Sequence, residues 1–300
     1  MDSGFVLLTA AKNEEKYIGL ALESVVRQSV HPLAWYIVDD GSTDSTPHVV
    51  ERYALAYPFI HLLHNQSGGE RSFGAQYRAI TMAYQTARKS GLDYDFVGMH
   101  DADIALQSTD YFKNLLAAFT ADSSLGVAGG YIFEKNHGRW RSRPANSPQA
   151  VAGGLQMFRR RCFEDIGGYT PLRFGGEDWL AQIEAKRFGW HIRALTTLAA
   201  FHHRPTSSAD GRLRGLVRLG MMDASFGSHP VFEILKCARR YREKPYVIAS
   251  LIRFYGYVRG SMSMDTPLLP PETVDYLRRE QKLRLTRLAS PFRSAAKSTA

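Results

Sequence analysis

Short apolar runs of strand length alternate with amphipathic helical stretches along residues 5–205. Phe5–Thr9, Trp35–Val38 and Asp95–Met99 are three of these runs, and each is too short for a buried helix. Between the first two, Ile18 and Leu22 begin an apolar face that repeats with helical spacing. Strands that alternate with helices in this way predict an α/β protein whose mainly parallel sheet is flanked by crossover helices.

Polar residues end three of the predicted strands. Thr9, Asp39 and Asp101 lie at or just beyond the ends of these runs, and the carboxyl ends of parallel strands meet at the edge where such sheets bind ligands. Asp103 follows Asp101 after one residue, and two carboxylates at this spacing can share one hard divalent cation. A surface turn is the alternative interpretation, because Asp is common in turns.

Composition limits the classes of protein to which the chain can belong. The 300 residues are 44% hydrophobic, which is ordinary for a globular protein with a sizeable core. Cys162 and Cys237 are the only cysteines, so we expect a reducing compartment and no disulfide framework. Met1 is followed by no signal peptide pattern, and no stretch reaches the ~20 apolar residues of a spanning helix. We therefore expect a cytoplasmic protein, whose membrane contact, if it has one, is peripheral and on the inner face of the cytoplasmic membrane.

Residues 211–300 differ in pattern from the part of the chain before them. The formal net charge of the whole chain is +9, and within residues 278–300 seven basic residues stand against a single acid, Glu280. The apolar stretch Tyr246–Tyr257 lies between basic helical stretches, which suits attachment to an anionic membrane surface. Packing on the main domain, or on a second subunit in a homodimer, is the alternative. We predict one domain over residues 1–210 and a helical region over residues 211–300.

Four motifs, in order, make the chain similar to glycosyltransferase family 2. They are the segments Thr9–Glu15, Asp39–Asp44, Asp101–Asp103 and Gly176–Asp178. The ordered set is much more specific than any one motif. The resemblance covers residues 4–205 and implies the GT-A fold, a Rossmann-like sheet shared by inverting enzymes that use nucleotide sugars. One departure is that Ala11 and Lys12 stand where many relatives carry proline and an aromatic residue.

The resemblance implies a donor site at the strand ends. A nucleoside diphosphate is a poor leaving group until its charge is neutralised, and Mg²⁺ or Mn²⁺ bound at Asp103 would neutralise it. Asp101 would contact this cation directly or through ribose or water. Asp39 is similar to the carboxylate that accepts a base N–H in this family. The other expected donor contacts are Thr9 and Glu14 at the base and ribose, and Arg71 at the base or diphosphate, with a surface arginine as the alternative for Arg71.

The resemblance also implies the groups on the acceptor side. Asp178, at a predicted helix start beside two glycines, matches the general base that removes the proton of the acceptor hydroxyl. One base on the face opposite the leaving group implies a single displacement with inversion. Glu177 is expected to orient the acceptor or tune Asp178, or else only to place negative charge at the helix start. His202 or His203 matches a position that completes the metal site in many relatives.

The expected reaction transfers a hexosyl group from a UDP-, GDP- or dTDP-sugar to a hydroxyl of a glycan or lipid-linked acceptor. A sugar-nucleotide nucleotidyltransferase is a first alternative, but its usual glycine-rich phosphate loop is replaced here by Ala10–Glu14. A non-catalytic module for anionic polymers is a second alternative, and it leaves the acidic strand ends unexplained. We expect no nucleic-acid partner, because the basic excess is mainly C-terminal rather than interleaved with aromatic residues on one surface.

Overall fold

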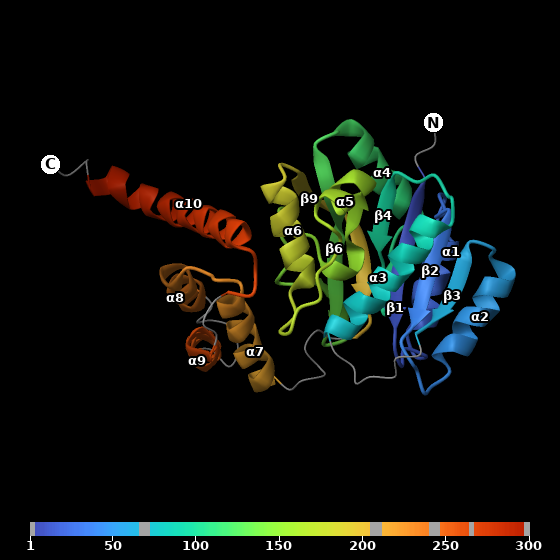
Figure 1. The fold of residues 1–300 in the computed structure, drawn as a ribbon, viewed down its shortest axis with the longest axis horizontal. Coiled ribbons are helices and arrows are strands. Elements are labelled where there is room, and N and C mark those ends of the chain that lie inside the picture. The colour runs from blue at the N-terminus through green and yellow to red at the C-terminus, as the bar shows by residue number, and fades with distance from the viewer. Residues whose placement is uncertain (1–3, 66–72, 205–211, 240–246, 264–266, 297–300) are drawn as a thin grey trace. The chain divides into compact units, whose positions relative to one another are not determined.

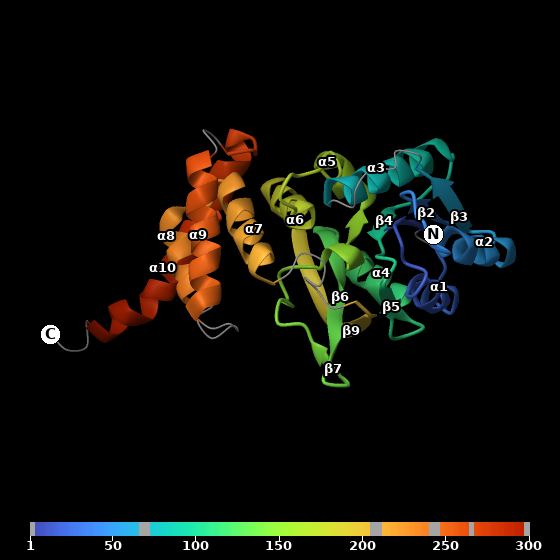
Figure 2. The ribbon, with the colours of Figure 1, turned by 90° about the horizontal axis from the view of Figure 1, so that it is seen from below.

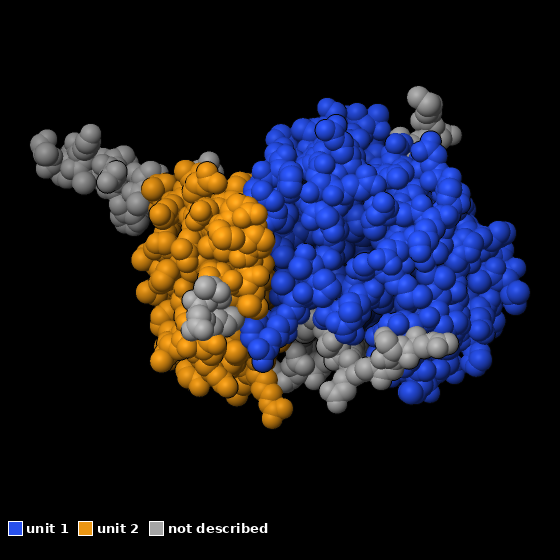
Figure 3. Space-filling view, in the orientation of Figure 1, with its two compact units in different colours: residues 1–205 blue, residues 206–300 orange. Residues whose placement is uncertain are grey.

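The computed structural model describes residues 4–65, 73–204, 212–239, 247–263 and 267–296, and Figure 1 shows their fold. The chain divides into two compact units, residues 1–205 and residues 206–300, which Figure 3 distinguishes by colour. The boundary that we predicted after residue 210 lies outside the described residues.

The first unit is built around a sheet with helices on both of its faces, as Figures 1 and 2 show. Its strands are β1 (Phe5–Ala11), β2 (Ala34–Asp39), β3 (Ile60–His64), β4 (Phe96–Met99), β5 (Ile104–Leu106), β6 (Leu125–Asn136), β7 (Arg139–Ser142), β8 (Met157–Arg159) and β9 (His191–His202). Its helices are α1 (Ile18–Val26), α2 (Thr46–Ala56), α3 (Phe73–Lys89), α4 (Tyr111–Ala121), α5 (Arg160–Asp165) and α6 (Glu177–Arg187), with the short 3-10 turn η1 (Gly153–Leu155) before β8.

The strand order of this sheet is β3-β2-β1-β4-β8-β6-β9-β5, and β7 pairs with β6. β1 lies between β2 and β4 and is parallel to both, and β3 is parallel to β2. β8 is antiparallel to β4 and β6, whereas β6 and β9 are parallel to each other. The predicted α/β class with a mainly parallel sheet is confirmed. Because β1, β2 and β4 run in the same direction, their carboxyl ends lie along one edge.

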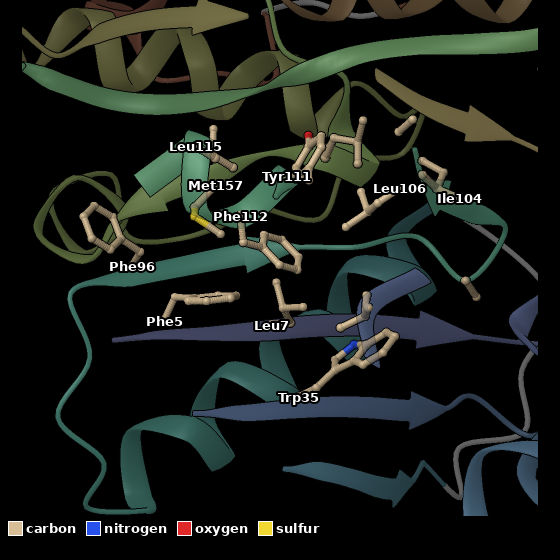
Figure 4. Close-up of a cluster of buried hydrophobic side chains, with 14 of the residues drawn as sticks. Phe5, Leu7, Trp35, Phe96, Ile104, Leu106, Tyr111, Phe112, Leu115 and Met157 are labelled. Atoms are coloured by element: carbon tan, nitrogen blue, oxygen red, sulfur yellow. The ribbon is translucent and has the colours of Figure 1, made fainter. Parts of the chain in front are cut away.

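Alternate side chains of β1 enter two different cores. Phe5 and Leu7 belong to the cluster on the face of α1, α2 and α4, and Figure 4 shows them together with Trp35. Val6 and Leu8 belong to the cluster on the opposite face, which α3, α5 and α6 cover. Burying a side chain of this size stabilises the fold by about 1.5–3 kcal/mol. The two cores therefore fix β1 from both sides and give the strand ends a rigid support.

β6 and β9 form the longest strand pair of the sheet. β9 extends to His202, because its residues after Leu198 also pair with β6. A shift of register after Gly130 accommodates the residues left unpaired between the two paired stretches. Beyond the pair, β6 turns through Gly138, at φ 78°, into β7. β6 and β7 therefore form a hairpin.

The second unit contains the helices α7 (Arg212–Ser225), α8 (Pro230–Arg239), α9 (Val247–Ser263) and α10 (Pro271–Ala296). Glycines let α7 and α9 approach closely: a Cβ at Gly220 would lie 2.0 Å from the Arg253 carbonyl oxygen, and one at Gly256 would lie 2.2 Å from that of Val217. Any larger residue at these two positions would force the helices apart. Among the described residues, no helix combines the length and the apolar character that crossing a membrane requires.

A buried ion cluster connects three helices of the second unit. Asp223 of α7 accepts hydrogen bonds from Arg253 of α9, with Nη2 2.7 Å from Oδ2, and from Lys236 of α8, with Nζ 2.8 Å from Oδ1. Lys236 also lies 3.2 Å from Glu233 Oε1. Because removing one partner would leave a buried charge uncompensated, the cluster favours one arrangement of these helices.

Candidate active site

Two aspartates lie at the edge where β1, β2 and β4 end. Asp39 is the last residue of β2 and pairs in register with Ala11 of β1. Asp101 follows β4 after His100, whose backbone N–H donates to the Leu8 carbonyl at 3.0 Å. The edge that we inferred from strand order therefore exists, with one carboxylate on either side of β1.

The turn η1 brings a third carboxylate, Asp178, to the same place. A Cβ at Gly154 would lie 2.2 Å from Asp101 Oδ2, and a Cβ at Gly153 would lie 3.0 Å from Asp178 Cβ. The two adjacent glycines therefore lie against two carboxylates that are far apart in sequence. The backbone fixes this arrangement further, because the Asp101 N–H donates to the Gly154 carbonyl at 3.2 Å.

Glycines and glutamines position Asp178 at the start of α6. Gly175 and Gly176 have φ values of 83° and 96°, in the left-handed region that glycine adopts without strain. The Asp178 carbonyl then accepts hydrogen bonds from Gln156 Nε2 and Gln182 Nε2, both at 3.0 Å. The helix start thus has its backbone anchored, which fixes the direction in which the carboxylate leaves it.

Burial and like charge shift the pKa values of these carboxyl groups. Burial, together with the negative charge of Asp103, raises the pKa of Asp101 to about 7. Burial also raises the pKa of Asp178, although backbone N–H groups and the nearby positive charge of Arg143 act in the opposite direction. Shifts of this kind, in carboxyl groups gathered at one sheet edge, are typical of functional sites.

His202 lies between two carboxylates. Its Nε2 is 3.4 Å from Asp103 Oδ1, and its Nδ1 is 3.0 Å from Glu134 Oε1. Burial alone would lower the pKa of His202, but the contacts with Asp103 and Glu134 raise it. Burial alone would likewise raise the pKa of Asp103, but the contacts with His202 and Arg204 lower it. The imidazole is therefore a counter-ion to Asp103 when protonated, and a potential metal ligand when Nε2 is free of its proton.

Arg204 connects the N-terminal loop of the unit to its last residues. It forms a buried ion pair with Glu14, and its Nε lies 3.5 Å from Asp103 Oδ2. We did not select Arg204 from the sequence, although its position directly after His202 and His203 was a usable signal. Gln76 was missed as well: its Nε2 donates to Asp101 Oδ1 at 3.3 Å, and nothing in the sequence around it indicated this contact.

The expected nucleotide contacts have different surroundings. Asp39 Oδ1 accepts the Ser42 N–H at 3.1 Å. The other carboxylate oxygen of Asp39, Oδ2, lies 3.7 Å from His64 Nδ1. The hydroxyl of Thr9 is buried, donates to the His100 carbonyl and accepts from Trp35 Nε1. Thr9 thus fixes the chain just before Asp101 from inside the protein. Arg71 lies outside the described residues.

Two further expected residues have clear neighbours. Glu177 is buried, and its Oε1 accepts the Leu172 N–H at 3.0 Å, so that it ties the glycine-containing loop to the start of α6. The His203 backbone N–H donates to the Asp103 carbonyl at 2.9 Å. The ring of His203 meets Trp140 edge-on, at 5.3 Å between centroids. Burial lowers the pKa of His203, which keeps its ring neutral near pH 7.

Arg143 lies between the hairpin β6–β7 and Asp178. Its backbone N–H donates to the Ile132 carbonyl at 2.9 Å, and its charge opposes the rise that burial causes in the pKa of Asp178. Its Nε is buried and has no hydrogen-bond partner within the part of the chain that the structure describes. Exposed neighbours on the hairpin, Lys135, Arg139 and Arg141, add positive charge beside it.

The carboxylates do not enclose a metal ion by themselves. Among the described residues, no group of three or more His, Cys, Asp or Glu side chains is arranged as a metal site. Asp101 and Asp103 instead offer an incomplete set of hard oxygen donors, which suits a cation that takes its remaining ligands from a bound phosphate and water.

Solved structures identify the class of protein that this fold and edge define. PcManGT, a mannosyltransferase from Pyrobaculum calidifontis in complex with GDP-Man and Mn²⁺, gives a TM-score of 0.59 at 17% identity, over 98% of this chain and 83% of that chain. S. aureus TarS 1-349 gives a TM-score of 0.53 at 19% identity, over 72% and 65% of the two chains. These neighbours are GT-A glycosyltransferases, so the GT-A fold is confirmed.

The sequence match then identifies the family. The model of glycosyl transferase family 2 matches residues 7–177, and the chain belongs to this family. Among known proteins, the uncharacterized glycosyltransferase YibD of Escherichia coli (strain K12) is 27% identical over 129 residues. That match covers 42% of this chain and 33% of YibD, so the chain spans about a third of that relative's length. The family is named for glycosyl transfer.

Proposed function

We propose that the protein is an inverting hexosyltransferase, which moves a sugar from a nucleotide-diphosphate sugar to a hydroxyl group with the help of a divalent cation. The observation that carries this proposal is the position of Asp101 and Asp178 on the adjacent glycines of η1. One carboxylate follows a strand at the ligand-binding edge, and the other begins a helix beside it. Such a transfer needs one carboxylate to hold the cation of the donor and another to act as the base. Asp101 and Asp178 would supply these two groups.

The residues present fit a divalent cation at the donor site. The raised pKa of Asp101 reflects burial close to the negative charge of Asp103, and a bound cation would relieve that repulsion. Mn²⁺ or Mg²⁺ would be held by Asp101 and Asp103, with His202 or His203 as an additional ligand. When bound, the cation neutralises the charge that develops on the departing diphosphate. PcManGT, which shares the fold, was solved with Mn²⁺ and GDP-Man.

The nucleotide would lie along the ends of β1 and β2. Asp39 has an oxygen that is not used by Ser42, and this oxygen is suited to accept an N–H of the base. Glu14, held by Arg204, shapes the loop beside it and is our candidate for the ribose. Arg71 remains a proposed contact to the base or diphosphate of the donor. Thr9 would act indirectly, because its hydroxyl holds the His100 carbonyl just before Asp101.

Asp178 would act as the general base. It would accept the proton of the acceptor hydroxyl as that oxygen attacks the anomeric carbon, while the bond to the diphosphate breaks on the opposite face. Glu177 would keep Asp178 in position through its contact with the loop at Leu172. A single displacement of this kind inverts the configuration of the anomeric carbon.

We infer the substrate classes from the family and its structural neighbours. The donor would be a UDP-, GDP- or dTDP-sugar, since the titles of the neighbours name GDP-Man and UDP-GlcNAc. The acceptor would be a hydroxyl of a glycan or lipid-linked saccharide in polysaccharide biosynthesis. The basic residues of the hairpin β6–β7 would suit an acceptor that carries negative charge.

Thermal denaturation with UDP, GDP, dTDP and CDP, each with and without Mn²⁺, tests the donor site. A ligand that binds only the folded protein raises the melting temperature by mass action, so a metal-dependent rise with one nucleotide is expected. Asp103→Asn should remove the metal-dependent part of this rise. Asp93→Asn, which changes an exposed aspartate before β4, is the matched control. If none of the four nucleotides raises the melting temperature, the donor-site proposal is wrong.

A further inference from the structure

We propose that the second unit docks on an anionic lipid surface through the exposed apolar face of α9. This face consists of Val247, Ile248, Leu251, Tyr255, Val258 and Met262. The proposal goes beyond glycosyl transfer, and it concerns residues 206–300 alone.

The side chains of this face are exposed although they are apolar. Leu251, Tyr255 and Met262 have exposed fractions of 63%, 58% and 83%, and Val247 and Ile248 are similarly exposed. Val247 and Ile248 are adjacent, and from Ile248 onward successive members are three or four residues apart, which places them along one side of a helix. A continuous apolar strip of this kind marks a contact surface rather than the scattered apolar residues of an ordinary surface.

The opposite face of α9 is already used by the fold. Arg253 is buried in its pair with Asp223, and Gly256 and Gly260 lie against α7 with no space for a side chain. Tyr257 is also buried and donates its hydroxyl proton to the Ser228 carbonyl at 2.7 Å. The apolar strip is therefore additional to what holds α9 in its unit, and folding of the unit does not require it.

The charge of the chain is concentrated in the unit that carries this strip. Residues 206–300 contain 17 Lys and Arg residues and 8 Asp and Glu residues, whereas residues 1–205 contain 21 of each. The whole net charge of +9 thus belongs to the second unit. Arg259 is exposed next to Val258 on α9 itself. On α10 the exposed basic side chains include Arg279, Lys282 and Arg284.

This charge selects the occupant of the strip. A second copy would bring two units of charge +9 together, and that repulsion opposes a dimer through this face. Anionic headgroups instead attract the basic residues, while the apolar strip enters the boundary between headgroups and acyl chains. Tyr255 is suited to this boundary, because its ring is apolar and its hydroxyl remains hydrated. An anionic bilayer is therefore the partner that satisfies both the charge and the apolar strip.

Sedimentation of the full chain with lipid vesicles tests the proposal. The protein should sediment with phosphatidylcholine vesicles that contain phosphatidylglycerol, should bind much less to pure phosphatidylcholine, and should be released by salt. The double variant Leu251→Ser, Tyr255→Ser should bind at least about tenfold more weakly, because two apolar side chains leave the interface. Leu55→Ser is the matched control, since Leu55 is an exposed leucine of the first unit, 89% exposed.

A direct measurement keeps the test decisive if the double variant is less stable. Tyr255→Trp should show a blue-shifted increment of fluorescence with anionic vesicles, relative to the unmodified chain, and none with neutral vesicles. Equal binding by the double variant and the Leu55→Ser control would overturn the proposal, as would an unchanged Tyr255→Trp spectrum. Dimers of the unmodified chain that the double variant converts to monomers in sedimentation velocity would also overturn it, in favour of a second copy as the occupant.

Discussion

Asp101 and Asp178 are both buried carboxyl groups, but their electrostatic surroundings differ. Burial raises the pKa of both carboxyl groups. Asp101 then faces the charge of Asp103, whereas Asp178 receives backbone hydrogen bonds, among them one from Gly153, and the positive charge of Arg143. In the proposed mechanism, Asp101 would therefore be the group that gains from a cation, and Asp178 would be the group that accepts the proton of the acceptor.

The first prediction at this scale concerns the base. Asp178→Asn should lower the rate of sugar transfer by about 10²–10⁴-fold, because an amide cannot accept the acceptor proton. Nucleotide affinity should be unchanged. The rate is measured by release of the diphosphate and the affinity by titration calorimetry, both with the nucleotide that the thermal panel selects. Glu184→Gln on the same helix is the control. A variant that transfers sugar at the normal rate would exclude Asp178 as the base.

The second prediction concerns the pH dependence of the reaction. Burial raises the pKa of Asp178, the positive charge of Arg143 opposes this rise, and a base must be deprotonated to act. Arg143→Gln should therefore raise that pKa and move the acid limb of the kcat/KM profile to higher pH, whereas Arg143→Lys should restore it. Arg141→Gln, at an exposed site on the same hairpin, should leave the profile in place. An acid limb at the same pH in Arg143→Gln would contradict the proposed coupling.

At the scale of elements, the short turn η1 contacts two carboxylates of the candidate site. It presents Gly153 to Asp178 and Gly154 to Asp101. Asp101 follows a strand and Asp178 begins a helix, and the backbone of η1 lies against both carboxylates. A residue with a Cβ has no space at Gly154, because that atom would lie 2.2 Å from an oxygen of Asp101.

Gly154→Ala tests this role. Either Asp101 or the turn must move, which we expect to destabilise the protein by about 1–3 kcal/mol and to abolish the metal-dependent nucleotide response. Thermal denaturation with and without the nucleotide and Mn²⁺ measures both effects. Gly19→Ala on α1, where an added Cβ meets nothing within 4 Å, should keep the response. A full response in Gly154→Ala would show that the close approach is not needed.

The close approach of α7 and α9 in the second unit gives a similar prediction for protein stability. Gly256→Ala would place a Cβ 2.2 Å from the Val217 carbonyl oxygen, so α7 and α9 must separate. We expect a loss of about 1–3 kcal/mol of unfolding free energy. Chemical denaturation followed by circular dichroism measures it. Gly215→Ala, on α7 with nothing within 4 Å of the added atom, should be neutral or stabilising.

At the scale of the whole molecule, chemistry and charge are assigned to different units. The proposed donor and base residues, from Thr9 to Arg204, belong to residues 1–205, as does the whole match to the family. All of the net positive charge belongs to residues 206–300. Under the two proposals above, the first unit would perform the transfer and the second would determine where the transfer takes place.

A truncated chain of residues 1–205 tests this division. It should fold and should show the same nucleotide-dependent and metal-dependent rise in melting temperature as the full chain, because its site residues and both cores are present. It should also lose sedimentation with anionic vesicles. If the truncated chain folds but no longer binds the nucleotide, the second unit contributes to the donor site and the division is wrong.

The sequence by itself determined the parts of this protein that depend on local pattern. Apolar runs predicted the end of β4 and, to within one residue, the end of β2, whereas β1 continues two residues beyond the predicted Thr9. The rule for parallel strands placed Asp39 and Asp101 at one edge. Two glycines before Glu177 predicted the start of α6 with Asp178 in its first turn. The ordered motifs predicted the family and the fold. Each of these rests on residues that are close together in the chain, where spacing and residue type carry the physical information.

Only the tertiary structure decided which distant residues meet. Glu14 and Arg204 are 190 residues apart and form an ion pair, because β9 returns beside β6 and brings its end to the first loop. The glycines of η1 lie between Asp101 and Asp178 because β8 enters the sheet next to β4. Likewise, the apolar strip of α9 is exposed because its opposite face packs on α7. Contacts of this kind follow from the order in which strands and helices pack, and that order depends on the balance of all their buried surfaces together rather than on any local pattern.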